Sequence, residues 1–187
     1  MKYFNFKIAI LFLSFLSFSQ LHAGNFMVEA GYFGNGDFSE TGFGGFNLDG
    51  RIFFSKKAEG IFVNLNPILF AAGSDYALEN NLPTSFTSFQ FGGGFQTYLS
   101  KVLYFGFSAG AGYGNGEFKT QDSVFGIRFS SAETRSALVT TYGAYLGLTA
   151  PPRGRFGFSG KVGIKGITID SEPALGVEIS AGFRIGR

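Results

Sequence analysis

The 187-residue sequence predicts an all-β protein: an eight-stranded antiparallel up-and-down transmembrane β-barrel that follows an N-terminal signal peptide. Apolar residues recur at every second position in eight segments, as expected for strands with one apolar face. Short and long connections alternate between these segments, and no charged residue falls on the apolar face of any of them. Hydrophobic residues make up 45% of the chain, which is too much apolar surface for a disordered polypeptide.

Residues 1–23 have the features of a secretory signal peptide. Lys2 and Lys7 supply positive charge, residues 8–18 form a short apolar run, and Ala23 provides a small residue before the expected cleavage point. The apolar run is shorter than the roughly 20 residues of a membrane-spanning helix, so an uncleaved anchor is the weaker interpretation. Cleavage would leave residues 24–187 as one barrel domain.

The eight predicted strands follow one another along the chain. They span residues 26–32, 46–54, 61–66, 89–99, 103–114, 138–148, 156–165 and 175–185. Their apolar positions are, strand by strand, Phe26, Val28, Ala30 and Tyr32; Phe46, Leu48, Ile52 and Phe54; Ile61, Val63 and Leu65; Phe89, Phe91, Phe95 and Leu99; Leu103, Phe105, Phe107, Ala109, Ala111 and Tyr113; Leu138, Tyr142, Ala144, Leu146 and Leu148; Phe156, Phe158, Val162 and Ile164; Leu175, Val177, Ile179, Ala181, Phe183 and Ile185. The fifth alternates most clearly, and the third least, because Pro67 lies near its end.

The other face of these strands indicates which side is the interior. It consists largely of Gly, Ser, Gln and Asn, with Tyr104 and Tyr145 as the main large exceptions. Small residues suit the inside of a narrow barrel, and the large apolar residues then face lipid. A soluble lipocalin-like barrel would need a polar exterior and an apolar pocket, so it is disfavoured.

The connections differ in length at the two ends of the predicted barrel. Short turns are expected at 55–60, 100–101 and 150–154, and long loops at 34–42, 71–85, 115–135 and 167–174. The long loops carry mostly acidic side chains: Asp37, Glu40, Asp75, Glu79, Glu117, Asp122, Glu133, Asp170 and Glu172, with Lys119, Arg128 and Arg135 as the basic ones. Tight turns opposite long loops are typical of outer-membrane barrels.

Seven charged residues fall on the inward face of the predicted strands. They are Glu29, Asp49, Arg51, Lys161, Lys165, Glu178 and Arg184. Eight strands enclose only enough space for side chains, and charges buried there must pair. We therefore expect a salt-bridge network that closes the lumen, with an ion-conducting or gating arrangement as the alternative.

The whole pattern resembles the small outer-membrane barrels of the OmpA, OmpX and opacity-protein type. The resemblance covers residues 24–187 and rests on the signal peptide, the eight strands, the charged interior and the long outer loops. It implies export to the outer membrane of a Gram-negative-type (diderm) bacterium, contact with outer-membrane lipid, folding by the barrel-assembly machinery, and a monomer. Such families commonly end in an aromatic residue, whereas this chain ends in Arg187.

Composition argues against enzymatic chemistry. The chain has no Cys, and its one His, His22, lies in the predicted signal peptide. A Ser-His-Asp triad or a thiolate nucleophile is therefore excluded from the mature chain, and the known enzyme families on small outer-membrane barrels use a His. We expect no catalytic residue, no cofactor and no metal site. Nucleic-acid binding has no support, since no basic exterior face is predicted.

Three functions remain open. The favoured one is a structural or surface-interaction barrel that contacts other molecules through the loops at 71–85 and 115–135. The alternative is a narrow pore or a transport barrel for small hydrophobic molecules. A soluble periplasmic lipid-binding barrel is the least favoured.

Overall fold

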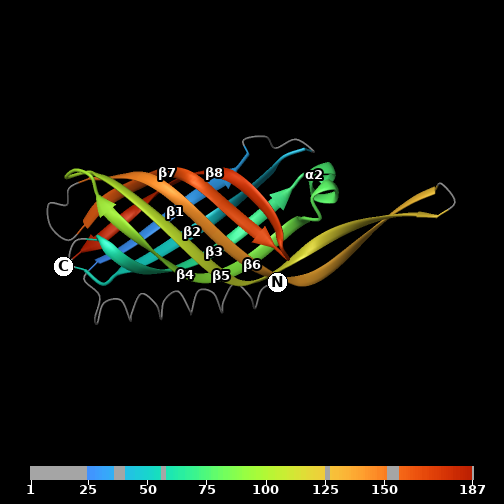
Figure 1. Cartoon of the computed structure of the whole chain (residues 1–187), viewed down its shortest axis with the longest axis horizontal. Coiled ribbons are helices and arrows are strands. Elements are labelled where there is room, and N and C mark those ends of the chain that lie inside the picture. The colour runs from blue at the N-terminus through green and yellow to red at the C-terminus, as the bar shows by residue number, and fades with distance from the viewer. Residues whose placement is uncertain (1–24, 36–40, 56–57, 125–126, 151–155, 187) are drawn as a thin grey trace.

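The computed structural model describes residues 25–35, 41–55, 58–124, 127–150 and 156–186. The predicted signal peptide lies outside the described residues. The eight strands are β1 (Asn25–Gly34), β2 (Phe43–Phe53), β3 (Gly60–Ala72), β4 (Pro83–Tyr98), β5 (Leu103–Val124), β6 (Ile127–Thr149), β7 (Phe156–Ile169) and β8 (Glu172–Gly186). Each strand pairs antiparallel with its neighbours in the sequence, and β1 pairs with β8 to close the barrel (Figure 1). The predicted fold class is confirmed.

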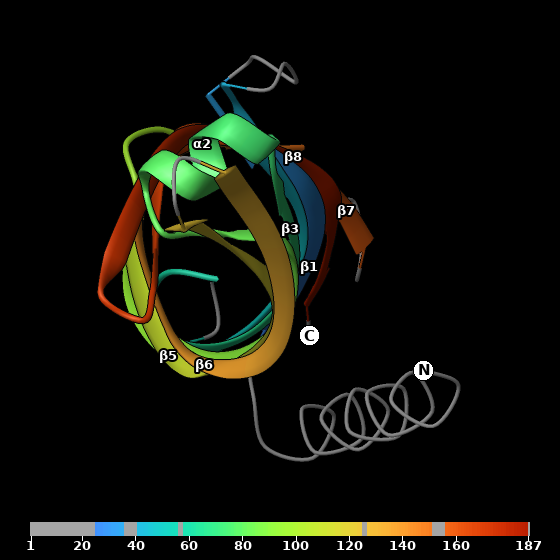
Figure 2. The ribbon, with the colours of Figure 1, turned by 90° about the vertical axis from the view of Figure 1, so that its right-hand side faces the viewer.

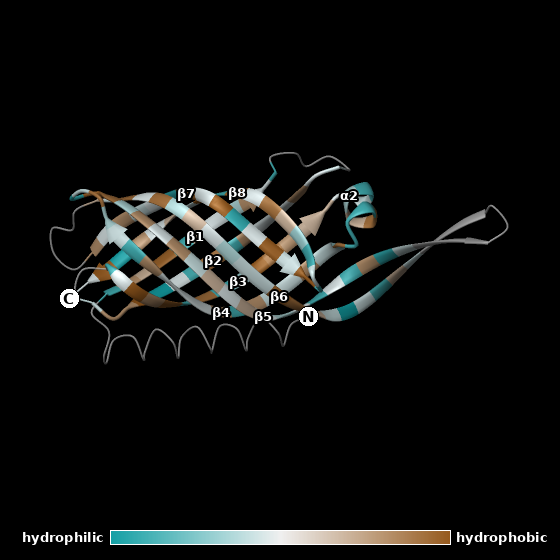
Figure 3. Ribbon diagram, viewed as in Figure 1, coloured by the Kyte–Doolittle hydropathy of each residue, from teal (hydrophilic) through white to brown (hydrophobic). Residues whose placement is uncertain are grey.

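Large apolar side chains cover the outside of the barrel. The exposed fraction is 63% for Phe46, 57% for Phe91 and 64% for Ile179, and apolar bands run across the strands in Figure 3. A soluble barrel would not leave so much apolar surface in contact with water. This surface is the lipid-facing belt of a transmembrane barrel. None of the helices in the described part of the chain has the length and apolar character to cross a membrane.

The two ends of the barrel differ. The end that carries the β5–β6 hairpin is called the outer end here, and the opposite end, where the chain turns between β2 and β3 and between β4 and β5, is called the turn end. A short helix, α2 (Ser74–Glu79), lies over one side of the outer end (Figure 2). Its Tyr76 ring packs on Phe43 with 5.3 Å between the centroids.

The prediction of a long loop at residues 115–135 was wrong. β5 and β6 continue past the barrel as a paired ribbon that reaches Val124 and Ile127, and it projects well beyond the other strands in Figure 1. Cross-strand contacts between polar side chains support it: Thr120 Oγ1 lies 2.7 Å from Ser131 Oγ. Polar residues predominate in the ribbon, so it lacks the apolar alternation from which strands are predicted.

Two other predicted loops were also too long. β3 continues to Ala72 and β4 begins at Pro83, so the segment at 71–85 is a shorter connection that contains α2. β7 and β8 are joined by a tight turn at Asp170 and Ser171, whose φ angles are +50° and +78°. Positive φ at both central residues is the mark of the type I′ hairpin turn, whose twist matches that of the strands it joins.

Pro67 lies inside β3 rather than ending it. It pairs with Phe89 of β4, whereas the β2–β3 pairing is interrupted between Asn47–Ile68 and Gly50–Leu65. Proline has no backbone N–H, so the ladder on that side loses a hydrogen bond at this position. The strand survives because pairing continues on both sides of the gap.

Candidate functional site

The centre of the lumen holds a network of six charged side chains. Arg51 of β2 is fully buried and forms ion pairs with Glu29 of β1 and, at 3.2 Å between Nε and Oδ2, with Asp49. Alternation along β2 directs Asp49 and Arg51 to the same side of the sheet. The two strands β1 and β2 therefore bring opposite charges together in the interior of the barrel, where their side chains are buried.

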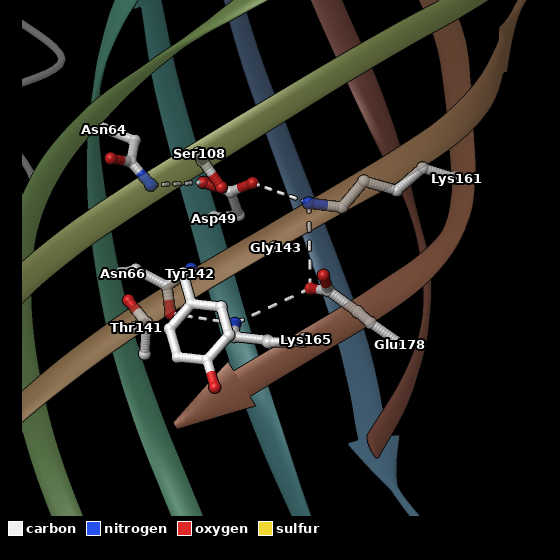
Figure 4. A pocket seen from close by; sticks show the side chains of 10 residues that line it. All are labelled: Asp49, Asn64, Asn66, Ser108, Thr141, Tyr142, Gly143, Lys161, Lys165 and Glu178. Carbon is white, nitrogen blue, oxygen red and sulfur yellow. Dashed lines mark hydrogen bonds and ion pairs between the residues drawn. The ribbon is translucent and has the colours of Figure 1, made fainter. Parts of the chain in front are cut away.

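Two lysines of β7 complete the network. Lys161 Nζ lies 2.8 Å from Asp49 Oδ2 and 3.6 Å from Glu178 Oε1 (Figure 4). It also lies 3.7 Å from Glu29 Oε2. Lys165 Nζ lies 3.6 Å from the same Glu178 oxygen. Three acids and three bases thus balance in formal charge, which greatly lowers the cost of burying them.

Neutral side chains add hydrogen bonds to the charged side chains of the network. Arg51 Nη1 donates to Gln96 Oε1 at 2.7 Å and to the Tyr145 hydroxyl at 3.2 Å. The Tyr104 hydroxyl donates to Glu29 Oε1 at 3.1 Å, and Asn47 Nδ2 donates to Glu178 Oε1 at 2.8 Å. Hydrogen bonds of this kind make a buried ion pair tolerable, because they replace the water that each charge has lost.

Arg184, the seventh predicted residue, lies apart from the other six. Its Nη1 is 3.4 Å from the Tyr98 hydroxyl, and within the described residues no carboxylate lies in ion-pair range of it. It sits on β8 toward the turn end, opposite Met27 of β1 and Gly157 of β7. The alternation along β8 directs Arg184 inward, but sequence position alone does not give its height in the barrel.

Apolar layers fill the lumen above and below the charges. At the outer end a cluster is formed by Phe33, Phe43, Ile68, Phe70, Leu82, Phe86, Phe118, Ala137, Val139, Ile167, Ile169 and Ala174, with Tyr76 of α2 packed against it. Toward the turn end a second cluster is formed by Met27, Phe53, Ala58, Phe62, Tyr104 and Tyr145. A cavity within the charge network has about 10 Å³, room for about one water molecule.

Tyr104 and Tyr145 were predicted to face inward, but the rings of Phe33, Phe62 and Phe86 were not, although the strand pairing contains a signal for all five. Five inward aromatic residues each pair across the sheet with a glycine: Phe33 with Gly45, Phe62 with Gly94, Phe86 with Gly116, Tyr104 with Gly147, and Tyr145 with Gly106. A Cβ on any of these glycines would collide with the ring opposite. The glycine face thus makes room for rings rather than for an open channel. The pattern can be found only once the strand register is known.

The base of the hairpin is held on both sides at the outer end. Arg135 of β6 lies over the Phe118 ring, 4.1 Å from its centroid, and 3.5 Å from Asp170 Oδ2 of the β7–β8 turn. Lys119 Nζ donates to Ser74 Oγ of α2 at 3.2 Å. The hairpin is therefore attached to the barrel by polar contacts as well as by its two strands.

Comparison with solved structures identifies the architecture. The barrel is similar to Ail, the attachment invasion locus protein of Yersinia pestis, with a TM-score of 0.51 and 20% identity over 87% of this chain and 99% of that one. The N-terminal barrel of Pseudomonas aeruginosa OprF gives a TM-score of 0.45 at 12% identity, covering 85% and 97%. Neisserial surface protein A gives 0.44 at 10% identity, covering 87% and 96%.

No protein-family model and no curated protein matches the sequence. The likeness to Ail and the closed eight-stranded topology agree with each other and with the exposed apolar belt. This chain has the fold of the small eight-stranded outer-membrane β-barrels.

Proposed function

We propose that this protein is a non-enzymatic barrel of the outer membrane that anchors the β5–β6 hairpin and α2 at the cell surface, where they contact other molecules. The packing of the lumen carries this proposal. Two apolar clusters and a charge network occupy the interior, and the cavity among the charges holds about 10 Å³. A hydrated ion or a small hydrophobic solute would have to displace buried side chains to pass.

The hairpin is the part of the molecule best placed for contact. Its strands pair from Gly116–Arg135 to Val124–Ile127, and their side chains from Ser131 to Ser136 are all exposed. An ordered ribbon loses less conformational freedom on binding than a flexible loop of the same length would. The barrel then serves as a rigid support for a surface that is already in shape.

The charge of the outer end restricts the class of partner. Ail has been solved in complex with sucrose octasulfate, a heparin analogue. The outer connections of this chain are mostly acidic, and exposed Asp75, Glu79, Glu117 and Glu133 would repel a sulfated polyanion. We infer a neutral or cationic partner surface for this protein, in contrast to the polyanionic ligand in that Ail complex.

Four measurements test the proposal. The mature chain should sediment with membranes, shift its gel mobility on boiling, and stay electrically silent in planar bilayers.

In a surface-binding experiment, immobilised protein should retain polylysine and not heparin at low salt, and the interaction with polylysine should be lost at high salt. Steady conductance that changes in Arg51→Ala would contradict the proposal in favour of a pore. A protein that stays soluble without detergent would instead favour a periplasmic lipid binder.

A further inference from the structure

We propose that the free edge of β6 above the barrel pairs with the same edge of a second copy of this chain carried by an apposed membrane. The inference rests on the proposed function, since it needs the hairpin to stand outside the cell. The partner that we propose for the hairpin is the same hairpin of a second copy of this chain.

One edge of the hairpin lacks a neighbouring strand over a long stretch. β6 pairs with β5 from Ile127 onward, but it pairs with β7 only from Val139. Within the described part of the chain, residues 127–138 of β6 thus have a strand on one side only. Edge strands are usually protected by charged side chains, Pro or a bulge; this stretch contains no Lys and no Pro, and its charged residues are Arg128, Glu133 and Arg135. Its backbone groups are available for pairing.

The direction of those backbone groups follows from the contacts of Leu138. Leu138 N–H donates to Asp170 Oδ1 at 3.2 Å, and its C=O accepts from Asp170 N–H at 3.0 Å, both on the β7 side. Direction alternates along a strand, so residues 136, 134, 132, 130 and 128 also turn their N–H and C=O away from β5. The odd-numbered residues between them bond to β5 and hold the hairpin together.

The β7–β8 turn sets the length of strand that can be added. A strand running along β6 toward the barrel would meet Asp170 at the level of Leu138. An antiparallel pairing that is symmetric about Ala132 uses the whole edge and stops at that point. It places Ala132 opposite Ala132 of the second copy, Thr134 opposite its residue 130, and Ser136 opposite its residue 128.

This register brings no like charges opposite each other and causes no clash at the twofold axis. Glu133 would lie opposite Ser131, and Arg135 opposite residue 129, so no like charges face each other. Alanine at the twofold axis allows the two strands to approach without a clash between large side chains.

Symmetry determines where the second copy must be. Antiparallel pairing about a twofold axis puts the two barrels at opposite ends of a four-stranded sheet. Two barrels in one membrane point the same way and would bring their β6 edges together in parallel. The pairing therefore connects two membranes, and it would make vesicles or cells that carry the protein adhere to each other.

Vesicle adhesion provides the first test, with proline as the probe of the edge. Thr134→Pro removes an outward N–H while leaving every bond between β5 and β6, whereas Thr134→Ala keeps the N–H and removes only the side chain. Proteoliposomes of the wild type and of Thr134→Ala should aggregate, as followed by light scattering. Those of Thr134→Pro should aggregate about tenfold less, because each symmetric pairing loses two hydrogen bonds. Retained heat-modifiability shows that Thr134→Pro still folds.

Single cysteines then test the register, because the chain has no Cys of its own. On oxidation of mixed vesicles, Ala132→Cys should form a dimer across the twofold axis, where opposed Cα atoms are about 5.5 Å apart. Thr134→Cys should stay monomeric, since its two copies would be about 13 Å apart. Mixing Thr134→Cys vesicles with Ser130→Cys vesicles should restore the cross-link.

The outcomes separate this inference from the proposed function. Dispersed wild-type vesicles with monomeric Ala132→Cys would overturn pairing with a second copy and leave a strand of another protein as the partner of the edge. Equal aggregation of wild type and Thr134→Pro would also overturn it, since contact would then not depend on the edge. Neither result bears on electrical silence in planar bilayers, which tests the proposed function alone.

Discussion

The rings of Tyr104 and Tyr145 meet edge to face inside the barrel, with centroids 6.1 Å apart and planes inclined at 79°. Each tyrosine pairs across β5 and β6 with the glycine two residues after the other tyrosine: Tyr104 with Gly147, and Tyr145 with Gly106. The hydroxyls then reach in different directions, from Tyr104 to Glu29 and from Tyr145 to Arg51. The two rings thus connect β5 and β6 to the charges of β1 and β2.

We expect Gly147→Ala and Gly106→Ala to destabilise the barrel by about 1–3 kcal/mol, as overpacking of a filled interior does. In each case the new Cβ would meet the ring opposite, which would have to withdraw from its charged partner. Urea unfolding in detergent micelles measures the change. The matched control is Gly160→Ala, whose Cβ would be 3.5 Å from the Ser180 carbonyl oxygen and should change little. Equal effects at all three glycines would show that the rings are not the cause.

We expect Arg51→Met to cost about 3–5 kcal/mol in the free energy of unfolding, because it leaves buried Glu29 without its main partner. Lys165→Met should cost less, since Glu178 keeps Lys161 at 3.6 Å. The double variant Glu29→Gln with Arg51→Met should recover much of the loss. A double-mutant cycle measures the coupling, and additive single effects would contradict the ion pair as the source.

The depth at which outward-facing residues lie in the membrane can be tested with two positions on β8. Ile179 and Leu175 both face outward, with exposed fractions of 64% and 59%, but Leu175 lies nearer the outer end. We expect Ile179→Arg to cost about 2–4 kcal/mol and Leu175→Arg about 0–1 kcal/mol, because the cost of a charge falls toward the membrane surface. Folding yields in lipid vesicles over a urea series report both. Equal, small costs would place the apolar belt outside lipid.

One substitution in the β7–β8 turn should stabilise the protein. Ser171 has a φ of +78°, where a side chain is strained and glycine is not. We expect Ser171→Gly to raise the free energy of unfolding by about 1 kcal/mol, while Asp170 keeps its contacts with Leu138 and Arg135. Ser171→Ala is the control and should bring no gain. A loss of stability in the glycine variant would mean that the Ser171 side chain contributes more than its backbone costs.

The sequence predicted the architecture because membrane strands obey a strict alternation. Phe105 and Phe107 face lipid while Gly106 faces inward, as expected from a period of two. Glu29, Asp49 and Arg51 were assigned to the lumen by the same rule, and the structure places them there. Which charge meets which could not be predicted, because pairing depends on register and stagger around the barrel.

The sequence-based predictions were wrong in two places: in the ribbon above the barrel, and for apolar residues that point into the lumen. Residues 115–124 and 127–135 form a ribbon in which polar residues predominate, so nothing in their polarity distinguishes strand from loop. Phe33, Phe62 and Ile167 are apolar yet point into the lumen. Their burial follows from glycines or small residues on neighbouring strands, which is information about pairs of residues rather than about one segment.

The position of the charges also has a consequence for the order of assembly. Every strand pair except β1–β8 joins neighbours in the sequence, so an open sheet can form before the seam closes. Glu29 lies on β1, whereas Lys161 lies on β7, across that seam. In an open sheet Lys161 can meet Glu178 of the neighbouring β8, but it stays apart from Glu29. Only a closed cylinder brings them within range, so correct closure alone neutralises the interior, and a sheet closed in a shifted register would be left with unmatched charge.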